Sequence, residues 1–243
     1  MQIYTLGTSH GHPEPGRACT SILLRVGSAN YLIDCGGNME LAMTNLGLKF
    51  EELRAVFVTH MHEDHTAALS SVIKRFTVYM RGRHVDIYLP EQAGIDGILA
   101  WVNALHIPPT DEQASFTVVA PGKIYRDDNI TVTAIPTKHI EEGRFPSYAY
   151  IVEAEGKRVL FTGDLCGDLR DYRAAVHERD FDAIVTEMTH YQLADQVDTF
   201  IKSHTKKLLF SHLSPRNVTK LPNFIDRFPF PVIIAEDGGC YEV

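Results

Sequence analysis

The chain has 243 residues, 44% of them apolar, which is enough to build the core of one domain spanning residues 1–243. Its formal charge of −8 and pI of about 5.8 disfavour a large sequence-independent nucleic-acid surface, because such a surface needs clustered lysine and arginine. Residues 1–6 lack a signal-peptide pattern, and no apolar run reaches the roughly 18 residues of a membrane span, so we expect a cytoplasmic protein.

Short apolar runs separated by turn residues predict hairpins at the start of the chain, followed by alternating strands and helices. We expect strands at residues 2–6, 19–26, 31–34, 55–58 and 85–89. We expect helices at residues 38–46, 66–76 and 91–106. Gly47 is placed to end the first of these helices, and Pro108 and Pro109 follow the last.

The rest of the chain predicts further short strands, again followed by alternation with helices. The expected strands are residues 116–119, 124–125, 130–136, 148–152, 158–161, 183–185, 208–210 and 232–235. The expected helices are 192–203 and 215–228, although Pro222 argues against a continuous second helix. This pattern predicts two mixed sheets packed together with helices outside.

A cluster of histidines and carboxylates, His60-Met61-His62-Glu63-Asp64-His65, lies between the strand at 55–58 and the helix at 66–76. Imidazole nitrogen and carboxylate oxygen are ligands that suit zinc and similar divalent metals. In an extended loop His60 and His62 point the same way, and the turn into the helix lets Asp64 and His65 face a second point. One ion cannot easily take all four, so the spacing predicts two adjacent metal ions. A solvated histidine-rich loop is the alternative.

Three more candidate ligands each follow an apolar strand, as the cluster does. His139 follows the strand at 130–136, Asp164 follows the strand at 158–161, and His212 follows the strand at 208–210. Four other histidines lack this context and are interpreted as surface or packing residues: His84, His106, His177 and His204.

The pattern H-x-H-x-D-H, followed by single His, Asp and His residues, resembles that of the metallo-β-lactamase-fold hydrolases. The resemblance implies an α/β (α+β) fold, a four-layer αββα sandwich of two mixed β-sheets flanked by helices, with a binuclear metal site at one edge. It implies His60, His62 and His139 on one metal. It implies Asp64, His65 and His212 on the other, with Asp164 bridging. The implied cofactors are two divalent metal ions, with zinc as the default and manganese or iron as alternatives.

Within these hydrolases the chain is most similar to the ribonuclease Z branch and its small phosphodiesterase relatives. The similar segments are Leu6-Gly7-Thr8-Ser9, Ile33-Asp34-Cys35-Gly36, Ser147-Tyr148-Ala149-Tyr150 and Ser211 to Arg216. In that branch a histidine upstream of the last ligand protonates the leaving group and a glutamate orients it. The resemblance carries these roles to His190, which is 22 residues before His212, and to Glu187. A packed or surface histidine is the competing interpretation of His190.

The spacing between the third histidine and the bridging aspartate differs from that of tRNA-cleaving members, which carry a long arm there. Only 24 residues, 140–163, separate His139 from Asp164, and the predicted hairpin uses most of them. We therefore expect no stable tRNA binding unless another chain supplies the arm, and a homodimer is left open. The shortened spacing favours a small phosphorylated substrate.

These features predict a metal-dependent hydrolase, a phosphodiesterase that acts on a small or cyclic phosphodiester through a metal-bridging hydroxide. Asp64, His190 and Glu187 are the expected catalytic residues, with His190 as proton donor to the leaving alkoxide. Asp34 is expected either to accept a hydrogen bond from a ligand's other ring nitrogen or to be a turn residue. The alternatives are hydrolysis of a lactone, thioester or other carbonyl substrate, a ribonuclease Z-like endonuclease without the arm, and a non-catalytic metal module.

Several other side chains are left without an assigned role. The loop after Gly7 is expected to approach the metals and carries His10 and His12. Arg81 and Arg83 form a basic patch that either meets a phosphate or is solvated. Four cysteines occur without a C-x-x-C pair: Cys19, Cys35, Cys166 and Cys240. Three of them lie in or beside apolar stretches and are expected to be buried thiols, and Cys166, two residues from Asp164, could line the site.

Overall fold

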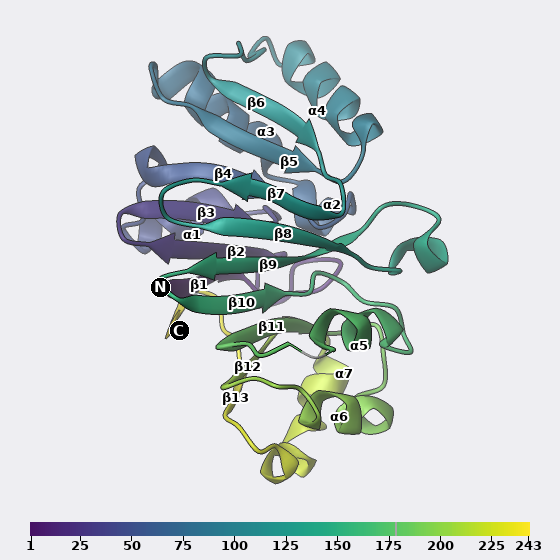
Figure 1. Ribbon diagram of the computed structural model, residues 1–243. Coiled ribbons are helices and arrows are strands. Elements are labelled where there is room, and N and C mark those ends of the chain that lie inside the picture. Colours follow the sequence, from purple (N-terminus) through teal and green to yellow (C-terminus); the bar gives the residue numbers. More distant parts are fainter. Residues whose placement is uncertain (178) are drawn as a thin grey trace.

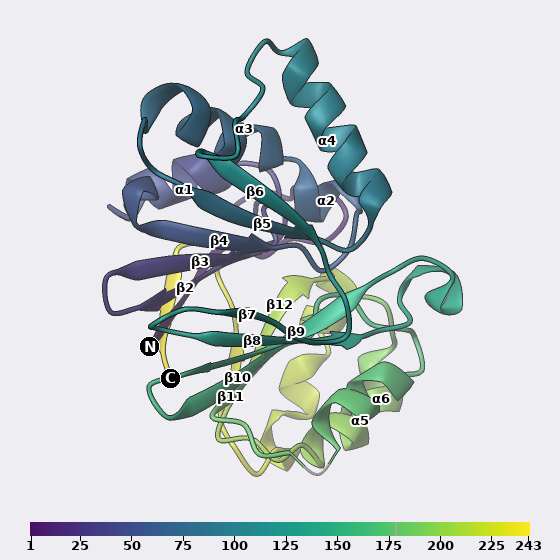
Figure 2. The same ribbon diagram turned by 45° about the horizontal axis from the view of Figure 1, so that its top comes forward.

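The computed structural model describes residues 1–177 and 179–243 as two seven-stranded sheets packed face to face, with helices on the outer faces (Figures 1 and 2). The first sheet has the order β14-β1-β2-β3-β4-β5-β6, and the second has the order β13-β12-β11-β10-β9-β8-β7. Each sheet mixes antiparallel hairpins with parallel strands. The four-layer sandwich expected from the sequence is therefore confirmed.

The strands have the following bounds. The first sheet contains β1 (Gln2–Gly7), β2 (Ser21–Val26), β3 (Ala29–Ile33), β4 (Leu53–Phe57), β5 (Val85–Leu89), β6 (Ala114–Val118) and β14 (Gly239–Glu242). The second contains β7 (Gly122–Arg126), β8 (Thr131–Pro136), β9 (Tyr148–Ala154), β10 (Lys157–Phe161), β11 (Ala183–Met188), β12 (Leu208–Leu213) and β13 (Val232–Ile234).

Helices cover both outer faces. Those on the first sheet are α1 (Met39–Asn45), α2 (Glu63–Thr66), α3 (Leu69–Lys74) and α4 (Gln92–Ala104). Those on the second are α5 (Arg170–Val176), α6 (Leu193–Ile201) and α7 (Pro215–Val218). A π-helical turn, η2 (Arg75–Tyr79), extends α3. Short 3-10 turns are η1 (Phe50–Glu52), η3 (Ile140–Gly143), η4 (Leu221–Asn223) and η5 (Ile225–Arg227).

Apolar side chains fill three layers of core. Tyr31, Phe57 and Tyr150 lie between the two sheets, where none is more than 1% exposed. Further clusters lie between the first sheet and its helices and between the second sheet and its helices. The central strands are buried on both faces, which explains why they read as continuous apolar runs rather than as alternating ones. Each fully buried large side chain contributes about 1.5–3 kcal/mol.

Some sequence expectations need correction. The helix expected at 215–228 is wrong, because α7 ends at Val218 and two short 3-10 turns follow. Pro222 has no amide hydrogen, so it cannot continue an α-helical ladder. The helix expected at 66–76 begins earlier, at Glu63, and is divided into α2 and α3. The helix α5 and the strand β14 were not expected from the sequence.

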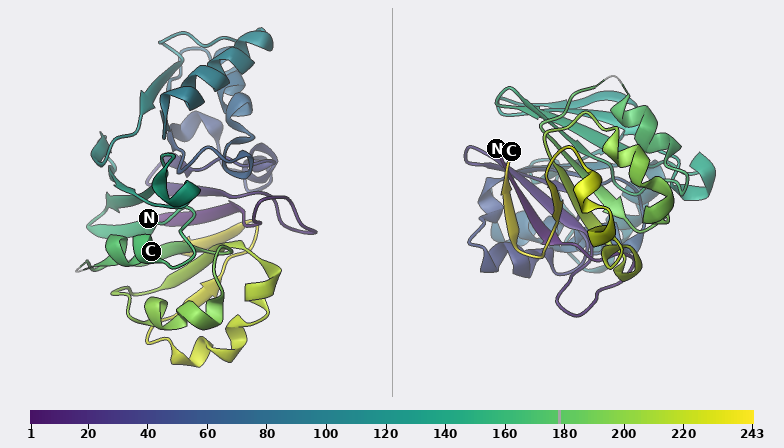
Figure 3. Two further views of the ribbon diagram at one scale, coloured as in Figure 1. Left: turned by 90° about the vertical axis from the view of Figure 1, so that its right-hand side faces the viewer. Right: turned by 90° about the horizontal axis from the view of Figure 1, so that it is seen from below.

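The C-terminal strand returns to the first sheet. The backbone amide of Val243 donates to the carbonyl of Met1 at 3.1 Å, and β14 pairs with β1. The two ends of the chain therefore lie side by side (Figure 3). In the part of the chain that the structure describes, no helix has the length and apolar character needed to cross a bilayer.

The strand directions bring several carboxyl ends to one edge of the sandwich. β3, β4 and β5 are parallel in the first sheet, and β10, β11 and β12 are parallel in the second. β8 runs in the same direction as β10, because both pair antiparallel with β9. The turn η3, which follows His139, projects from this edge (Figures 1 and 2). Side chains that follow these strands can therefore meet there.

Candidate metal centre

All seven predicted metal-binding residues meet at this edge. The first sheet supplies the cluster from His60 to His65, which follows β4 and enters α2. The second sheet supplies His139 after β8, Asp164 after β10 and His212 near the end of β12. His212 lies inside β12, not beyond it, and has a positive φ of 46° where the register with β11 shifts.

One group of ligand atoms consists of three imidazoles and one carboxylate. His60 Nε2 lies 2.9 Å from His62 Nδ1, and His139 Nε2 lies 3.4 Å from the same atom. Asp164 Oδ2 lies 3.7 Å from His60 Nε2 and 3.6 Å from His139 Nε2. These four donor atoms lie within 4.8 Å of one another, which is a separation that one cation can span.

A second group lies on the other side of Asp164. Asp164 Oδ1 is 3.5 Å from His65 Nε2 and 3.5 Å from His212 Nδ1. Asp64 Oδ2 is 3.4 Å from His65 Nε2 and 3.1 Å from His212 Nε2. The two oxygens of Asp164 thus face different groups, which is the arrangement expected of a bridging ligand.

The donor atoms fit a pair of divalent cations. His65 Nε2, Asp164 Oδ1 and His212 Nδ1 are buried and have no hydrogen-bond partner among the described residues. Leaving buried polar atoms unpaired costs about 1–3 kcal/mol each, so three that face one another need a common partner. A cation would supply it, and the mixture of imidazole and carboxylate suits zinc, manganese or iron.

Ring nitrogens on the far side of these imidazoles are held by oxygen atoms. His65 Nδ1 lies 2.8 Å from Asp34 Oδ2, and His60 Nδ1 lies 3.0 Å from Thr59 Oγ1. His139 Nδ1 faces the carbonyl of Leu165 at 3.4 Å. Such partners fix the tautomer and orientation of a ligand. Asp34 thus contacts the second ring nitrogen of a candidate ligand, which is one of the two interpretations that the sequence offered.

The charges of the site are strongly coupled. Burial lowers the pKa of His60 and of His139, so both favour the neutral form that binds metal. Burial also opposes ionisation of Asp164, but the imidazoles of His212 and His65 outweigh it and hold its pKa well below the usual value. Asp164 is therefore a carboxylate at neutral pH and can neutralise cations on both sides.

His190 and Glu187 form a pair beside this centre. His190 Nδ1 lies 2.9 Å and 3.0 Å from the two Glu187 oxygens, and Glu187 also accepts the His190 backbone amide at 2.9 Å. Burial opposes the charged imidazole, but the Glu187 carboxylate outweighs it and raises the pKa of His190 to about 9. The His190 side chain is 32% exposed, and its Nδ1 lies 3.7 Å from Asp164 Oδ2. A protonated imidazole thus faces solvent next to the candidate metal centre.

The loop after Gly7 reaches the centre, as expected. The backbone amide of Gly11 donates to Asp64 Oδ2 at 2.8 Å, and the His10 ring centroid lies 6.5 Å from that of His212. His12 packs edge-on against His10 at 5.2 Å. The Gly11 amide was not found by sequence reasoning, because a backbone donor leaves no residue-type signal.

The basic patch lies elsewhere. Arg81 and Arg83 precede β5, whereas the ligand edge lies at the other end of that strand. They therefore lie away from the candidate centre, and we interpret them as solvated surface residues. His84 and His204 are exposed ion-pairing residues with side chains 40% and 67% exposed, in agreement with the sequence interpretation.

The cysteines are free thiols, and Cys19, Cys35 and Cys166 are buried. Burial raises the pKa of the Cys166 thiol to about 11. Its sulfur donates to Asp168 Oδ1 at 3.1 Å, and the groups of candidate metal-binding side chains among the described residues do not include it.

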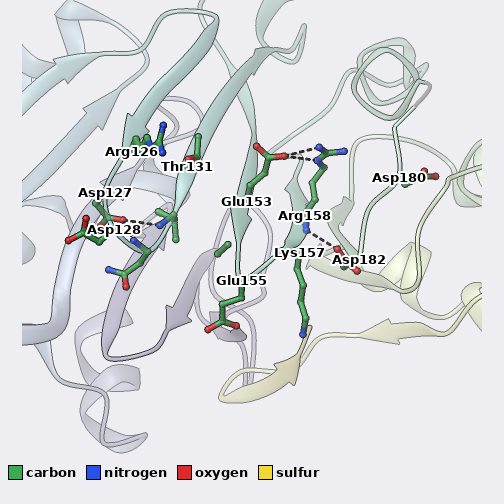
Figure 4. A pocket seen from close by; sticks show the side chains of 14 residues that line it. Arg126, Asp127, Asp128, Thr131, Glu153, Glu155, Lys157, Arg158, Asp180 and Asp182 are labelled. Atoms are coloured by element: carbon green, nitrogen blue, oxygen red, sulfur yellow. Dashed lines mark hydrogen bonds and ion pairs between the residues drawn. The ribbon is translucent and has the colours of Figure 1, made fainter.

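A large pocket of about 570 Å³ lies at the opposite end of the second sheet (Figure 4). It is lined by the start of β8 and by the turn between β9 and β10, and Arg158 pairs there with Glu153 at 2.7 Å. It holds none of the predicted site residues. The candidate metal centre is at the other end of the sandwich, at the edge with the histidines.

Comparison with known proteins places the chain in a family. Residues 1–216 match the family described as anti-Pycsar protein Apyc1. The chain belongs to this family. The Apyc1-family chain is also 32% identical to ribonuclease Z of Synechococcus sp. (strain CC9311) over 179 residues, which are 70% of this chain and 54% of that protein. It is 30% identical over 155 residues to ribonuclease Z of Acaryochloris marina (strain MBIC 11017), 63% of this chain and 48% of that protein. It thus spans about half the length of the curated relatives it matches.

Solved structures give the fold of the Apyc1-family chain. The metallo-β-lactamase fold protein YhfI from Bacillus subtilis has a TM-score of 0.77 at 18% identity, with 100% of this chain and 99% of that chain covered. The short form of human tRNase Z has a TM-score of 0.74 at 21% identity over 100% and 99%. A diphosphatase from the PhnP family has a TM-score of 0.76 at 16% identity over 100% and 97%. The fold is that of the metallo-β-lactamase proteins.

Proposed function

We propose that the protein is a metal-dependent phosphodiesterase that acts on a small or cyclic phosphodiester. The observation that carries this proposal is the position of Asp164, whose two oxygens face two separate groups of histidines. His60, His62 and His139 would hold one cation, and Asp64, His65 and His212 the other. A bound pair of divalent cations supplies a hydroxide nucleophile near neutral pH and neutralises charge on the phosphate.

The residues beside the centre suit a phosphate ester. His190 keeps a proton at neutral pH and faces solvent, so it can donate that proton to a departing alkoxide. Glu187 accepts from His190 Nδ1, which leaves Nε2 as the atom that transfers the proton. Glu187 also accepts the backbone amide of Leu165 at 2.8 Å, and this ties the proton donor to the segment that follows Asp164.

The short segment between His139 and Asp164 supports a small substrate, because this is the interval in which tRNA-cleaving relatives carry a long arm. The backbone amide of Thr137 donates to the carbonyl of Ser147 at 2.8 Å, and their hydroxyls hydrogen-bond at 2.6 Å. These bonds close the base of a short projection that contains η3, and β9 and β10 account for most of what remains. No long arm for a folded RNA fits in this interval, which favours a small substrate.

A ribonuclease Z-like endonuclease is the second candidate, and the sequence similarity to ribonuclease Z proteins favours it. A carbonyl hydrolase that acts on a lactone or thioester could use the same cations as Lewis acids. The Glu187–His190 pair and the segment from Ser211 to Arg216, which are similar to those of the phosphodiesterase branch, favour phosphate chemistry over this third candidate.

The test uses the full chain purified without added metal. Elemental analysis should find two divalent ions per chain, and zinc is our expectation. The protein should hydrolyse bis-p-nitrophenyl phosphate and a cyclic nucleotide, lose this activity with a chelator and regain it with zinc. An Asp164→Ala variant should lose both the activity and the two bound metal ions. Lactone turnover without phosphodiester turnover, or cleavage of precursor tRNA alone, would refute the proposal.

A further inference from the structure

Asp171 is a buried carboxylate in the first turn of α5, outside both groups of candidate ligands. Its residue is 5% exposed. Asp171 Oδ2 accepts the backbone amides of Cys166 at 2.9 Å and Lys138 at 3.1 Å, while Oδ1 accepts the amide of Tyr172 at 2.9 Å. One oxygen atom therefore joins two segments that are distant in sequence.

Both segments carry candidate metal ligands. Lys138 directly precedes His139, and Cys166 is two residues after Asp164. The Cys166 amide that donates to Asp171 belongs to the same peptide unit as the Leu165 carbonyl, and this carbonyl faces His139 Nδ1 at 3.4 Å. The separation of His139 from Asp164 is thus set by two short connections, one through Asp171 and one through the Leu165 carbonyl.

We propose that Asp171 is a positioning residue that holds His139 and Asp164 at the separation needed to bind the cation of the first group. Asp171 contacts neither ligand side chain directly. It acts through the backbone amides beside them. The inference rests on the proposed function only in that the protein must bind a metal pair.

The effect should differ between the two cations. His139 belongs only to the first group, with His60 and His62. The second group takes Asp64 and His65 from the first sheet and His212 from β12, and Asp171 contacts none of the segments that carry them. This group depends on Asp171 only through the shared Asp164. Removing a partner that orients metal ligands weakens metal affinity by about 10- to 100-fold. We expect a loss of this size for the ion of the first group, where both His139 and Asp164 are positioned through Asp171, and a smaller loss for the other ion, which shares only Asp164.

The experiment compares Asp171→Ala with Asp171→Asn and with Asp127→Ala as a matched control. Asp127 also accepts two backbone amides, those of Asn129 and Ile130 at 2.8 Å, but it lines the pocket at the far end of the sheet (Figure 4). Zinc stoichiometry and stepwise affinity are measured by competition with a chromogenic chelator. Cobalt-substituted protein provides an absorption spectrum for the geometry of the ions.

The wild-type protein should bind two ions. Asp171→Ala should bind the ion of the first group about 10- to 100-fold more weakly and should weaken the other ion less. Asp171→Asn should restore most of this affinity, because its amide oxygen can still accept both backbone donors. Asp127→Ala should lower the melting temperature but bind both ions normally. If Asp171→Ala does not fold, Asp171→Ser retains a shorter acceptor and should show the same selective loss.

Two results would overturn the role of Asp171 while leaving the proposed function intact. One is an unchanged affinity for both ions in the alanine variant. The other is an equal weakening of both ions that follows the loss of thermal stability, which would mean a general structural role. If the wild-type protein does not bind two metal ions, the proposed function is refuted, and the role of Asp171 is refuted with it.

Discussion

Replacement of His190 by alanine is a decisive test of the proposed chemistry. The imidazole is protonated at neutral pH, because the Glu187 carboxylate raises its pKa to about 9. A positioned general acid contributes about 100- to 10,000-fold, or roughly 3–5 kcal/mol of barrier. The His190 side chain is 32% exposed, so water can enter the vacated space and supply part of the lost proton. We therefore expect kcat to fall by about 100- to 1,000-fold, in the lower part of the range for a general acid.

The assay should use two phosphodiesters that differ only in the leaving group. An alkyl ester needs protonation of its departing oxygen and should show the full reduction, whereas a p-nitrophenyl ester leaves readily as the anion and should be affected far less. Glu187→Gln keeps a hydrogen-bonding group beside the ring and should give a smaller loss. His84→Ala, which removes an exposed histidine, is the control.

Metal content separates this role from a competing one. Asp164, His190 and His212 also have donor atoms within 4.8 Å of one another, so His190 could in principle bind metal itself. If His190 acts only as a proton donor, the His190→Ala variant should retain both metal ions. Loss of an ion in His190→Ala, or equal reductions for the two esters, would contradict the proton-donor role.

Three further substitutions test the support of the site. Asp34→Ala removes the acceptor for Thr59 N at 2.7 Å, Thr59 Oγ1 at 2.9 Å and His65 Nδ1 at 2.8 Å. We expect the free energy of unfolding to fall by about 3–5 kcal/mol, as measured by urea unfolding of chelator-treated protein. A decrease of less than about 1 kcal/mol would contradict this expectation. Gly36→Ala places a Cβ against the backbone oxygens of Asp64 and Thr20, whereas Gly37→Ala meets open space. Only the first should lower the melting temperature and the zinc content, and equal behaviour of the two would refute this reasoning. His139→Ala should reduce the zinc content from two ions to one, as measured by elemental analysis, and retention of both would exclude His139 as a ligand.

The sequence predicted the side chains that gather at this edge, because their signal is local. His60 to His65 combine metal-binding residue types with a position at the end of a buried strand, and both properties can be read within ten residues. Extension to His139, Asp164 and His212 needed only the rule that parallel strands deliver their carboxyl ends to one edge. The family resemblance then supplied the roles of His190 and Glu187.

The parts that were missed depend on contacts between distant segments. Asp171 is an ordinary acidic residue in a short helix, and its contacts with the amides of Lys138 and Cys166 depend on the pairing of β8 and β10 with β9. The Gly11 amide carries no side chain to notice. The error at 215–228 has a different cause, since local helix propensity competed with Pro222 and the proline prevailed.

The candidate centre joins the two halves of the sandwich. His60, His62, Asp64 and His65 extend from one sheet, while His139, Asp164 and His212 extend from the other. Bound cations would therefore add a link between two layers that already share an apolar core and hydrogen bonds, such as that from the Tyr150 hydroxyl to the Val58 carbonyl at 2.6 Å. A ligand held at 1,000 times its dissociation constant adds about 4 kcal/mol to folding stability. Metal supply would then govern how long the protein survives proteolysis, as well as whether it turns over substrate.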